Sequence, residues 1–390
     1  MQDRTHSLRW LLVFGAISSL SPLSFDLYLP ALTTIAHDLA ASTESMQQTV
    51  AVAMFGNALG MALYGPLSDR LGRRPVLFAA LAAFALASLA AAFAANVLAL
   101  LTLRLAQAFA VIAGRIVVQA MAADVLAGEA LARMQVSLTL VSGVAILVGP
   151  LLGAGILHAL GWRAIYVTLA ILGLAGCALC AVLMPETRGA EVRAQSRLEP
   201  VWRAYAPIAR NGAFLRIAIA SALSGAVFPI YLMCAPSILI DGFGLSPTLF
   251  AVLLSVQACT LLGGRALSRA LMRFASARRV FVVTQGVMLA IAGAAWVLSL
   301  FAPSPWTFLA PVYLTVLCFP MATALALPLA QDQARDRPGT ATSAFACLSA
   351  LIGGVAASLT SVFAANAAGV AFGMIVVSAL GVAVTAARRA

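Results

Sequence analysis

Charged residues are scarce in this sequence. Of its 390 residues only 9% are charged, whereas 63% are hydrophobic and the mean hydropathy is +1.01. A soluble protein of this length could not cover so much apolar surface with polar side chains. The composition therefore excludes a soluble globular protein and predicts an all-α membrane protein whose solvent is mostly lipid.

Histidine and paired cysteines are also scarce, which argues against an enzyme. The three histidines, His6, His37 and His158, are predicted near or outside the ends of apolar stretches. Cys177 and Cys180 form a CxxC without a second ligand pair, and all six cysteines are expected to be packing residues. An intramembrane enzyme would need a convergent nucleophile and base or a metal set. We expect no enzyme activity, no metal and no cofactor.

Hydrophobic runs dominate what is present. Each is about the ~20 residues that a membrane-spanning helix needs. We predict roughly twelve spans, near residues 10–30, 46–66, 75–95, 97–122, 134–157, 164–184, 213–238, 248–271, 279–301, 306–330, 340–363 and 366–387.

The distribution of basic residues predicts the orientation of these spans. All 24 basic residues are arginines. With the N-terminus in the cytoplasm, roughly twenty of them lie in cytoplasmic loops and tails and only Arg163 lies outside. We expect a multi-pass protein of the bacterial cytoplasmic membrane with both termini cytoplasmic. The net charge of +11 then reflects topology and attraction to anionic lipid headgroups, and no nucleic-acid partner is expected.

The longest polar break divides the spans into two sets of six. It predicts an N-terminal six-helix half at 1–187, a cytoplasmic linker at 188–212 and a C-terminal six-helix half at 213–390. In transporters built from such halves the substrate binds at their interface near the membrane midplane.

A compact charged loop separates the second and third spans, with the sequence Gly65-Pro-Leu-Ser-Asp69-Arg70-Leu-Gly72-Arg73-Arg74. Its two glycines are expected to allow a turn and close helix packing. Asp69 and the three arginines are expected to form an ionic cluster that is made or broken as helices shift. Ordinary arginine anchors at a helix end are the alternative. The segment resembles the loop 2–3 signature of the major facilitator superfamily.

Further segments resemble the twelve-span drug:proton antiporters of that superfamily. They are Asp26-Leu-Tyr28-Leu-Pro30, Arg104-Leu-Ala-Gln107, Gly149-Pro150-Leu-Leu-Gly153 and Gly161-Trp162-Arg163. The Gly-Pro element is similar to one associated with exporters, and the Asp-x-Tyr-Leu-Pro run looks most like the bicyclomycin and chloramphenicol resistance branch. The resemblance implies the major facilitator fold, with two six-helix halves around a central cavity. It also implies drug efflux by alternating access, driven by the proton gradient.

Asp26 and Arg104 are the candidates for proton coupling. Asp26 is the only acidic residue predicted inside an apolar span, where a carboxylate is costly without water, a partner or a ligand. Arg104 is predicted at a comparable depth, so the two could pair across the N-terminal half. Burial favours the protonated carboxyl and a nearby guanidinium favours the ionised one, so their separation could load or release a proton. The alternative is an interfacial Asp26 that reaches the outer surface.

The resemblance also assigns roles to the two motifs. Asp69 is expected to meet the start of the eleventh span near Gly339 and Thr340 and to favour the outward-open state. Gly149, Pro150 and Gly153 are expected to let the fifth span pack closely against the eighth span or its neighbours.

Polar stripes at helical spacing predict the substrate cavity. Arg104 and Arg115 are three helical turns plus about 20° apart, so they share one face of the fourth span, which is expected to line the cavity. The predicted lining residues are Tyr28, Asn57, Met61, Tyr64, Gln107, Arg115, Gln119, Ser221, Ser224, Phe228, Tyr231, Gln257 and Arg265. Helix packing is the alternative for the stripes of the second and seventh spans, and snorkelling to the membrane surface is the alternative for Arg115 and Arg265.

The charges in the spans predict the class of substrate. One carboxylate faces Arg104, Arg115 and Arg265, which disfavours multiply charged cations and favours a neutral, zwitterionic or weakly anionic amphipathic molecule. A proton-coupled metabolite exporter, an uptake symporter and a receptor are the competing hypotheses. The expected partners are the substrate, protons and the lipid bilayer, with the protein acting as a monomer.

Overall fold

The computed structural model describes residues 2–189, 201–334, 338–363 and 366–386, and every regular element within these ranges is helical. The first group of helices comprises α1 (Gln2–Asp26), η1 (Leu29–Ala31), α2 (Leu32–Asp38), α3 (Thr43–Leu71), α4 (Arg73–Ala92), α5 (Val97–Val125), α6 (Gly128–Leu160) and α7 (Trp162–Leu183). The second group comprises α10 (Gly212–Gly225), α11 (Val227–Pro236), η2 (Ser237–Gly242), α12 (Pro247–Leu271), α13 (Ala277–Phe301), α14 (Pro305–Gln331), α15 (Pro338–Phe363) and α16 (Ala367–Ala386). The short helix α9 (Val201–Ala209) lies between the two groups in sequence.

Polar caps fix where several of these apolar helices begin. Ser42 caps α3, Asn96 caps α5 and Ser246 caps α12, each by accepting a hydrogen bond from a backbone N–H of the first turn. Such caps satisfy N–H groups that have no partner inside the helix. The long apolar runs that follow then satisfy their backbone groups internally, as lipid requires.

Twelve helices of the described chain are long and apolar enough to cross a membrane, which confirms the predicted number of spans. The first span differs from its prediction, because it runs from Trp10 to Asp38 rather than ending near Pro30. Pro30 lies in η1, a single 3₁₀ turn that redirects the chain into α2 without ending the span. Asp26 is therefore near the middle of the span and not near its outer end.

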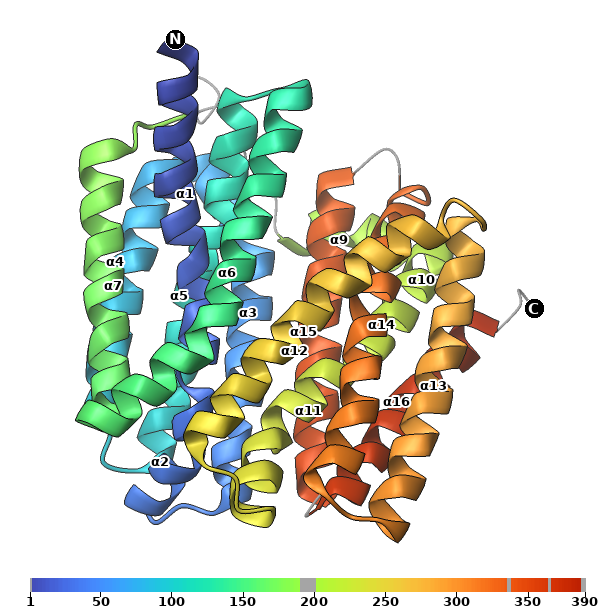
Figure 1. The fold of residues 1–390 in the computed structure, drawn as a ribbon. Helices are drawn as coiled ribbons and strands as arrows, with labels where there is room; N and C mark the ends of the chain where they lie inside the picture. The colour runs from blue at the N-terminus through green and yellow to red at the C-terminus, as the bar shows by residue number, and fades with distance from the viewer. Residues whose placement is uncertain (1, 190–200, 335–337, 364–365, 387–390) are drawn as a thin grey trace.

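The two groups of helices lie side by side, with α1 to α7 on one side and α10 to α16 on the other (Figure 1). They meet mainly where α3 packs on α15 and α6 packs on α12. We call the end of the bundle at which α1 begins and α3 ends the terminus face, and the end with α2 and the start of α12 the opposite face. Residues 190–200 of the predicted linker fall outside the described residues, and the boundaries at 188 and 212 stay predictions.

Hydrogen bonds join the two groups near the opposite face. The side-chain amide of Gln47, in the second turn of α3, donates to Ser237 Oγ of η2 at 2.8 Å. The neighbouring Gln48 donates to Ser361 Oγ at 2.9 Å and accepts from Ser358 Oγ at 2.6 Å, both on α15. These bonds close the two groups against each other at the opposite face.

Candidate functional site

Asp26 lies directly against the Gly-Pro element of α6. Its side chain is 9% exposed, and it is the one buried acidic residue in the described part of the chain. A Cβ atom built on Gly149 would come within 2.7 Å of the Asp26 Cβ, and one built on Gly153 would collide with the Leu27 carbonyl. Both glycines therefore let α6 approach the end of α1, and the partner of the motif is the first span rather than the eighth.

Arg104 is buried in the interior of the first group, 1% exposed. Its Nη1 donates to the Ser24 carbonyl at 3.2 Å and to Gln107 Oε1 at 2.8 Å. The guanidinium also lies over the ring of Tyr28, 4.4 Å from its centroid, which is a cation–π contact. Its Nε and Nη2 have no hydrogen-bond partner.

The expected Asp26–Arg104 ion pair is absent among the residues that the structure describes. Arg104 reaches α1 from α5 through the Ser24 carbonyl and the Tyr28 ring. Asp26 instead contacts α6. Arg104 thus contacts the backbone and rings that flank Asp26, whereas the Asp26 side chain packs on Gly149 of α6.

Tyr28 and Gln107 lie inside the first group and not on a cavity surface, contrary to the prediction. Both are fully buried. The Tyr28 hydroxyl bonds to Thr49 Oγ1, and the Gln107 amide donates to Ser88 Oγ on α4 at 2.7 Å. These bonds, with the Arg104 contacts, tie α1, α3, α4 and α5 together.

Farther along the same face of α5, the chain is uncovered. Arg115 is exposed and Gln119 is partly exposed, whereas Arg104 on that face is covered by the end of α1. Helical spacing puts Arg104 and Arg115 on one face of α5. Only the part of that face nearer the terminus face is uncovered. This difference matches the closure of the bundle at the opposite face.

Arg115 on α5 and Arg265 on α12 come from different groups of helices. Both are exposed, and they lie close enough for their charges to repel. Each is 18 residues after the first residue of its helix, which places both about 27 Å from the start of the helix at 1.5 Å per residue. The two arginines therefore stand equally far along helices that both begin at the opposite face.

The predicted lining residues of the second group are mostly covered. Ser221, Tyr231 and Gln257 are buried, and each has a side-chain polar atom without a hydrogen-bond partner: Ser221 Oγ, Tyr231 OH and Gln257 Nε2. Ser224 bonds to the Ala220 carbonyl and packs on Gly381, so it serves helix packing. Phe228 stacks on Phe319 with ring centroids 5.6 Å apart.

The predicted stripe on α3 is only partly exposed. Asn57 has an unpartnered buried Oδ1 atom, and Met61 is partly exposed. Tyr64 is buried and packs on Phe109 of α5. The contact between α3 and α5 is tight, since a Cβ on Gly56 would lie 2.6 Å from the Leu105 carbonyl oxygen.

The charged loop between α3 and α4 forms an ionic cluster centred on the buried Arg73. Its guanidinium binds Asp69 at 2.7 Å, Asp124 of α5 at 3.0 Å and Ser68 Oγ at 2.7 Å. Arg188 also lies near Asp69, at 3.7 Å. Gly72 makes the tight turn between the helices with a φ of 101°, which favours glycine.

Three acidic or basic members of this cluster were not among the predicted switch residues. Asp124, Glu186 and Arg188 come from the ends of α5 and α7 and the segment that follows. The Glu186 carboxylate accepts the backbone N–H groups of Arg73 and Arg74, at 3.0 and 3.2 Å, and so caps α4. Charged residues at span ends are common, so the sequence offered no signal that these were partners of Arg73.

One expectation for the loop differs from the structure, and another stays a prediction. Asp69 binds Arg73 and Arg188, and its expected contact with the start of α15 stays a prediction. A Cβ on Gly65 would meet nothing within 4 Å, so this glycine does not serve close packing. Arg70 is exposed, whereas the Arg74 guanidinium donates to the Ala181 carbonyl of α7 at 2.6 Å.

Twelve spans in two groups, a buried acid on a Gly-Pro element and a charged α3–α4 loop define a membrane transporter. The model of the Major Facilitator Superfamily matches residues 14–358, and the chain belongs to this family of transporters. It is a multi-pass membrane protein and not an enzyme.

Named relatives and a solved structure agree with this assignment. The chain is 27% identical over 359 residues to the Uncharacterized MFS-type transporter YdgK of Bacillus subtilis, covering 90% of this chain and 88% of the relative. It is 29% identical over 370 residues to a Chloramphenicol resistance protein of Pseudomonas aeruginosa, covering 92% and 85%. A bacterial homolog of the human lysosomal transporter Spinster, solved inward-facing and unoccupied, has the same fold with a TM-score of 0.73, 15% identity and coverage of 97% and 94%.

Proposed function

We propose that this protein is a proton-coupled antiporter that exports small amphipathic drugs from the bacterial cytoplasm. The arginine-rich loops support a cytoplasmic location of the terminus face. The observation that carries the proposal is the contact between Asp26, the buried acid, and Gly149 of the Gly-Pro element. The relative from Pseudomonas aeruginosa that is named a chloramphenicol resistance protein, which the chain matches over 92% of its length, supports drugs as the substrate class.

Asp26 is the proposed proton carrier. A carboxyl buried without a cationic partner is stable when it is neutral and costly when it is ionised. Because its side chain fills the contact between α1 and α6, a shift of α6 would change its access to water. In this account Asp26 holds a proton while the contact is closed and releases it when α6 moves away.

Arg104 positions the end of α1 in this mechanism. It donates a hydrogen bond to the Ser24 carbonyl, two residues before Asp26, and lies over the Tyr28 ring, two residues after Asp26. The proposed coupling therefore does not need an Asp26–Arg104 pair. It needs a rigid α1 end on one side of Asp26 and a movable α6 on the other.

Substrate would bind between the two groups of helices, near Arg115 and Arg265. Two neighbouring like charges, with no ion pair to a described acidic residue, create a positive potential there. This potential disfavours multiply charged cations and favours a neutral, zwitterionic or weakly anionic molecule of the size of chloramphenicol. Partly exposed Asn57 and Met61 supply polar and adaptable apolar contacts.

The direction of transport tests the proposal. Inverted membrane vesicles from an efflux-deficient bacterial host that makes the protein are given an inward-acid proton gradient and radiolabelled chloramphenicol. We expect uptake into the vesicles that collapses with an uncoupler and that is absent from vesicles without the protein. Uptake by right-side-out vesicles with the outside acid would instead show a symporter. A panel of antibiotics in the same host, with Asp26→Asn as the comparison, identifies the substrate class.

A further inference from the structure

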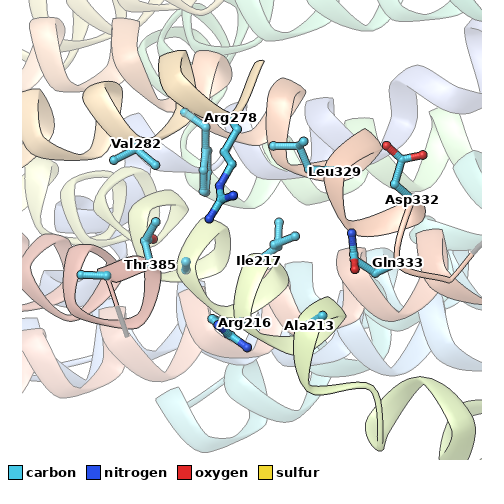
Figure 2. Close-up of a pocket in the computed structure, with 12 residues that line it drawn as sticks. Ala213, Arg216, Ile217, Arg278, Val282, Leu329, Asp332, Gln333 and Thr385 are labelled. Carbon is cyan, nitrogen blue, oxygen red and sulfur yellow. The ribbon is translucent and has the colours of Figure 1, made fainter. Parts of the chain in front are cut away.

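A cleft of about 940 Å³ opens within the second group of helices, on the terminus face. It lies between the beginnings of α10 and α13 and the ends of α14 and α16, which pack around it in a ring (Figure 2). The cleft contains none of the residues assigned above to proton coupling or substrate binding. Its lining residues are Ala213, Arg216, Ile217, Ala220, Arg278, Phe281, Val282, Leu329, Asp332, Gln333, Thr385 and Ala386.

The corresponding place in the first group is filled by ionic contacts. There the ring consists of α1, α4, α5 and α7. Arg73, the first residue of α4, is buried between Asp124 near the end of α5 and Glu186 after the end of α7. Asp69 and Asp124 neutralise the guanidinium of Arg73, and the Glu186 carboxylate accepts the backbone N–H groups of Arg73 and Arg74.

Two of these three carboxylates have no acidic counterpart in the second group. Asp69 stands four residues before Arg73, whereas Phe274 stands four residues before Arg278. Arg278 is the second residue of α13, and Asp332 follows the end of α14, as Asp124 lies at the end of α5. Glu186 stands three residues after α7, whereas in sequence the residue three positions after α16 is Arg389. An acid of the first group is thus replaced by a base.

Arg278 is the charged group that this difference leaves unneutralised. Figure 2 shows its side chain extending from α13 into the cleft toward Ile217. It forms no ion pair with a described residue. Arg216 and Asp332, which also line the cleft, each have other interactions. Two guanidinium groups against one carboxylate make the cleft basic.

A buried hydrogen-bond donor lies beside the cleft. Gln285, 1% exposed, shares the face of α13 that carries Arg278, since the two are seven residues or two turns apart. Its Oε1 accepts from Thr385 Oγ1 of the lining at 2.8 Å, while its Nε2 has no partner. A buried amide donor without a partner is costly and marks a place for an acceptor.

We propose that this cleft binds a phosphate group, carried by the headgroup of an acidic lipid or by a soluble phosphate compound. A guanidinium binds phosphate by paired charge-assisted hydrogen bonds, and basic pockets between membrane-spanning helices bind anionic headgroups. Arg278 binds the phosphate, and the bound anion neutralises Arg278 as Asp69 neutralises Arg73 in the first group. The apolar side chains of Ile217, Phe281 and Val282 cover the rest of the molecule.

Native mass spectrometry of the purified full-length protein tests the lipid source, with phosphatidylglycerol as the probe and phosphatidylcholine as the zwitterionic comparison. Calorimetric titration with inorganic phosphate tests the soluble source. We expect one phosphate-bearing probe to bind, and Arg278→Gln to raise its dissociation constant about tenfold. The matched control is Arg273→Gln, which removes an exposed arginine of the α12–α13 segment and should leave the constant within twofold.

Gln285→Met provides a second variant that keeps the arginine, with an expected loss of about threefold in affinity. Size-exclusion profiles and melting temperatures show whether each variant is folded. Binding of phosphatidylglycerol alone assigns a lipid site, and binding of inorganic phosphate assigns a soluble one. Equal binding by the wild-type protein, Arg278→Gln and Arg273→Gln, or no binding of either probe by the folded wild-type protein, would overturn the proposal.

Discussion

The Cβ of Asp26 lies so close to Gly149 that a methyl group on that glycine would come within 2.7 Å of it. The one buried acid of the described chain therefore contacts the Gly-Pro element that resembles those of exporters. This contact links the protonation of a single carboxyl to the packing of α1 on α6. It also gives the glycines of the element a physical role, which is to let α6 come close enough to cover Asp26.

Gly149→Ala should impair transport without preventing membrane insertion. The added methyl forces α6 away from α1, and overpacking of this kind costs about 1–3 kcal/mol. Efflux of the identified substrate from cells, normalised to the amount of inserted protein, measures the loss. Gly155→Ala is the matched control on the same helix, because a Cβ there meets nothing within 4 Å. Equal efflux by the two variants would show that the contact does not matter.

Arg73→Gln should destabilise the protein more than any other single change in the charged loop. Arg73 is the shared partner of Asp69 and Asp124, and removing one member of a buried ion pair costs about 3 kcal/mol. The melting temperature of the purified protein reports the change. The control Arg70→Gln alters an exposed arginine and should melt like the wild-type protein.

Asp69→Asn should impair transport with little effect on insertion or melting. Asp69 is 41% exposed, and Arg73 keeps its ion pair with Asp124 when Asp69 is replaced. The ionic cluster therefore survives the loss of Asp69. We predict that Asp69 contacts the eleventh span in another state of the transport cycle, and that the variant loses this contact. Normal efflux by properly inserted Asp69→Asn would contradict this role.

A disulfide across the opposite face should block transport reversibly. Gln47 and Ser237 are hydrogen bonded between the two groups of helices, so cysteines at both positions lie near each other in this state. In a background with the six native cysteines replaced, oxidation should stop efflux and reduction should restore it. The single variants Gln47→Cys and Ser237→Cys should be insensitive to oxidant. Undiminished efflux after complete cross-linking would show that this face does not open during transport.

Arg265→Glu should shift the preference of the site toward cations. The change replaces two mutually repelling arginines by an attracting pair and removes the positive potential between the groups. We expect the ratio of tetraphenylphosphonium to chloramphenicol efflux to rise in this variant relative to the wild type. Arg269→Gln, one turn farther toward the terminus face, is the control. A wild-type protein that exports tetraphenylphosphonium better than chloramphenicol would contradict the proposed substrate class.

The sequence predicted the fold well because lipid imposes a simple rule. Each span must be a long apolar helix, so hydropathy alone yields twelve spans close to those observed. The first span was misjudged because Pro30 reads as an end, whereas the structure uses it in a 3₁₀ turn and continues to Asp38. Asp26 thereby moves to mid-span.

The site could be predicted only in part, because helical spacing gives the face of a helix but not its neighbour. It placed Arg104 and Arg115 on one face of α5, yet α1 covers the first and leaves the second exposed. Which side of α1 Asp26 occupies depends on how α1 sits between α5 and α6, and no local pattern encodes that. The partners of Arg73 at the ends of α5 and α7 were missed for the same reason.

Proton release on substrate addition tests the central claim most directly. Purified protein is reconstituted in lightly buffered liposomes that contain a pH-sensitive dye, and the substrate identified by the antibiotic panel is added. We predict a substrate-dependent pH change for the wild-type protein and for Glu129→Gln, which alters an exposed acid, and no change for Asp26→Asn. If correctly folded Asp26→Asn gave the same pH change as the wild-type protein, the proton would be carried by another group.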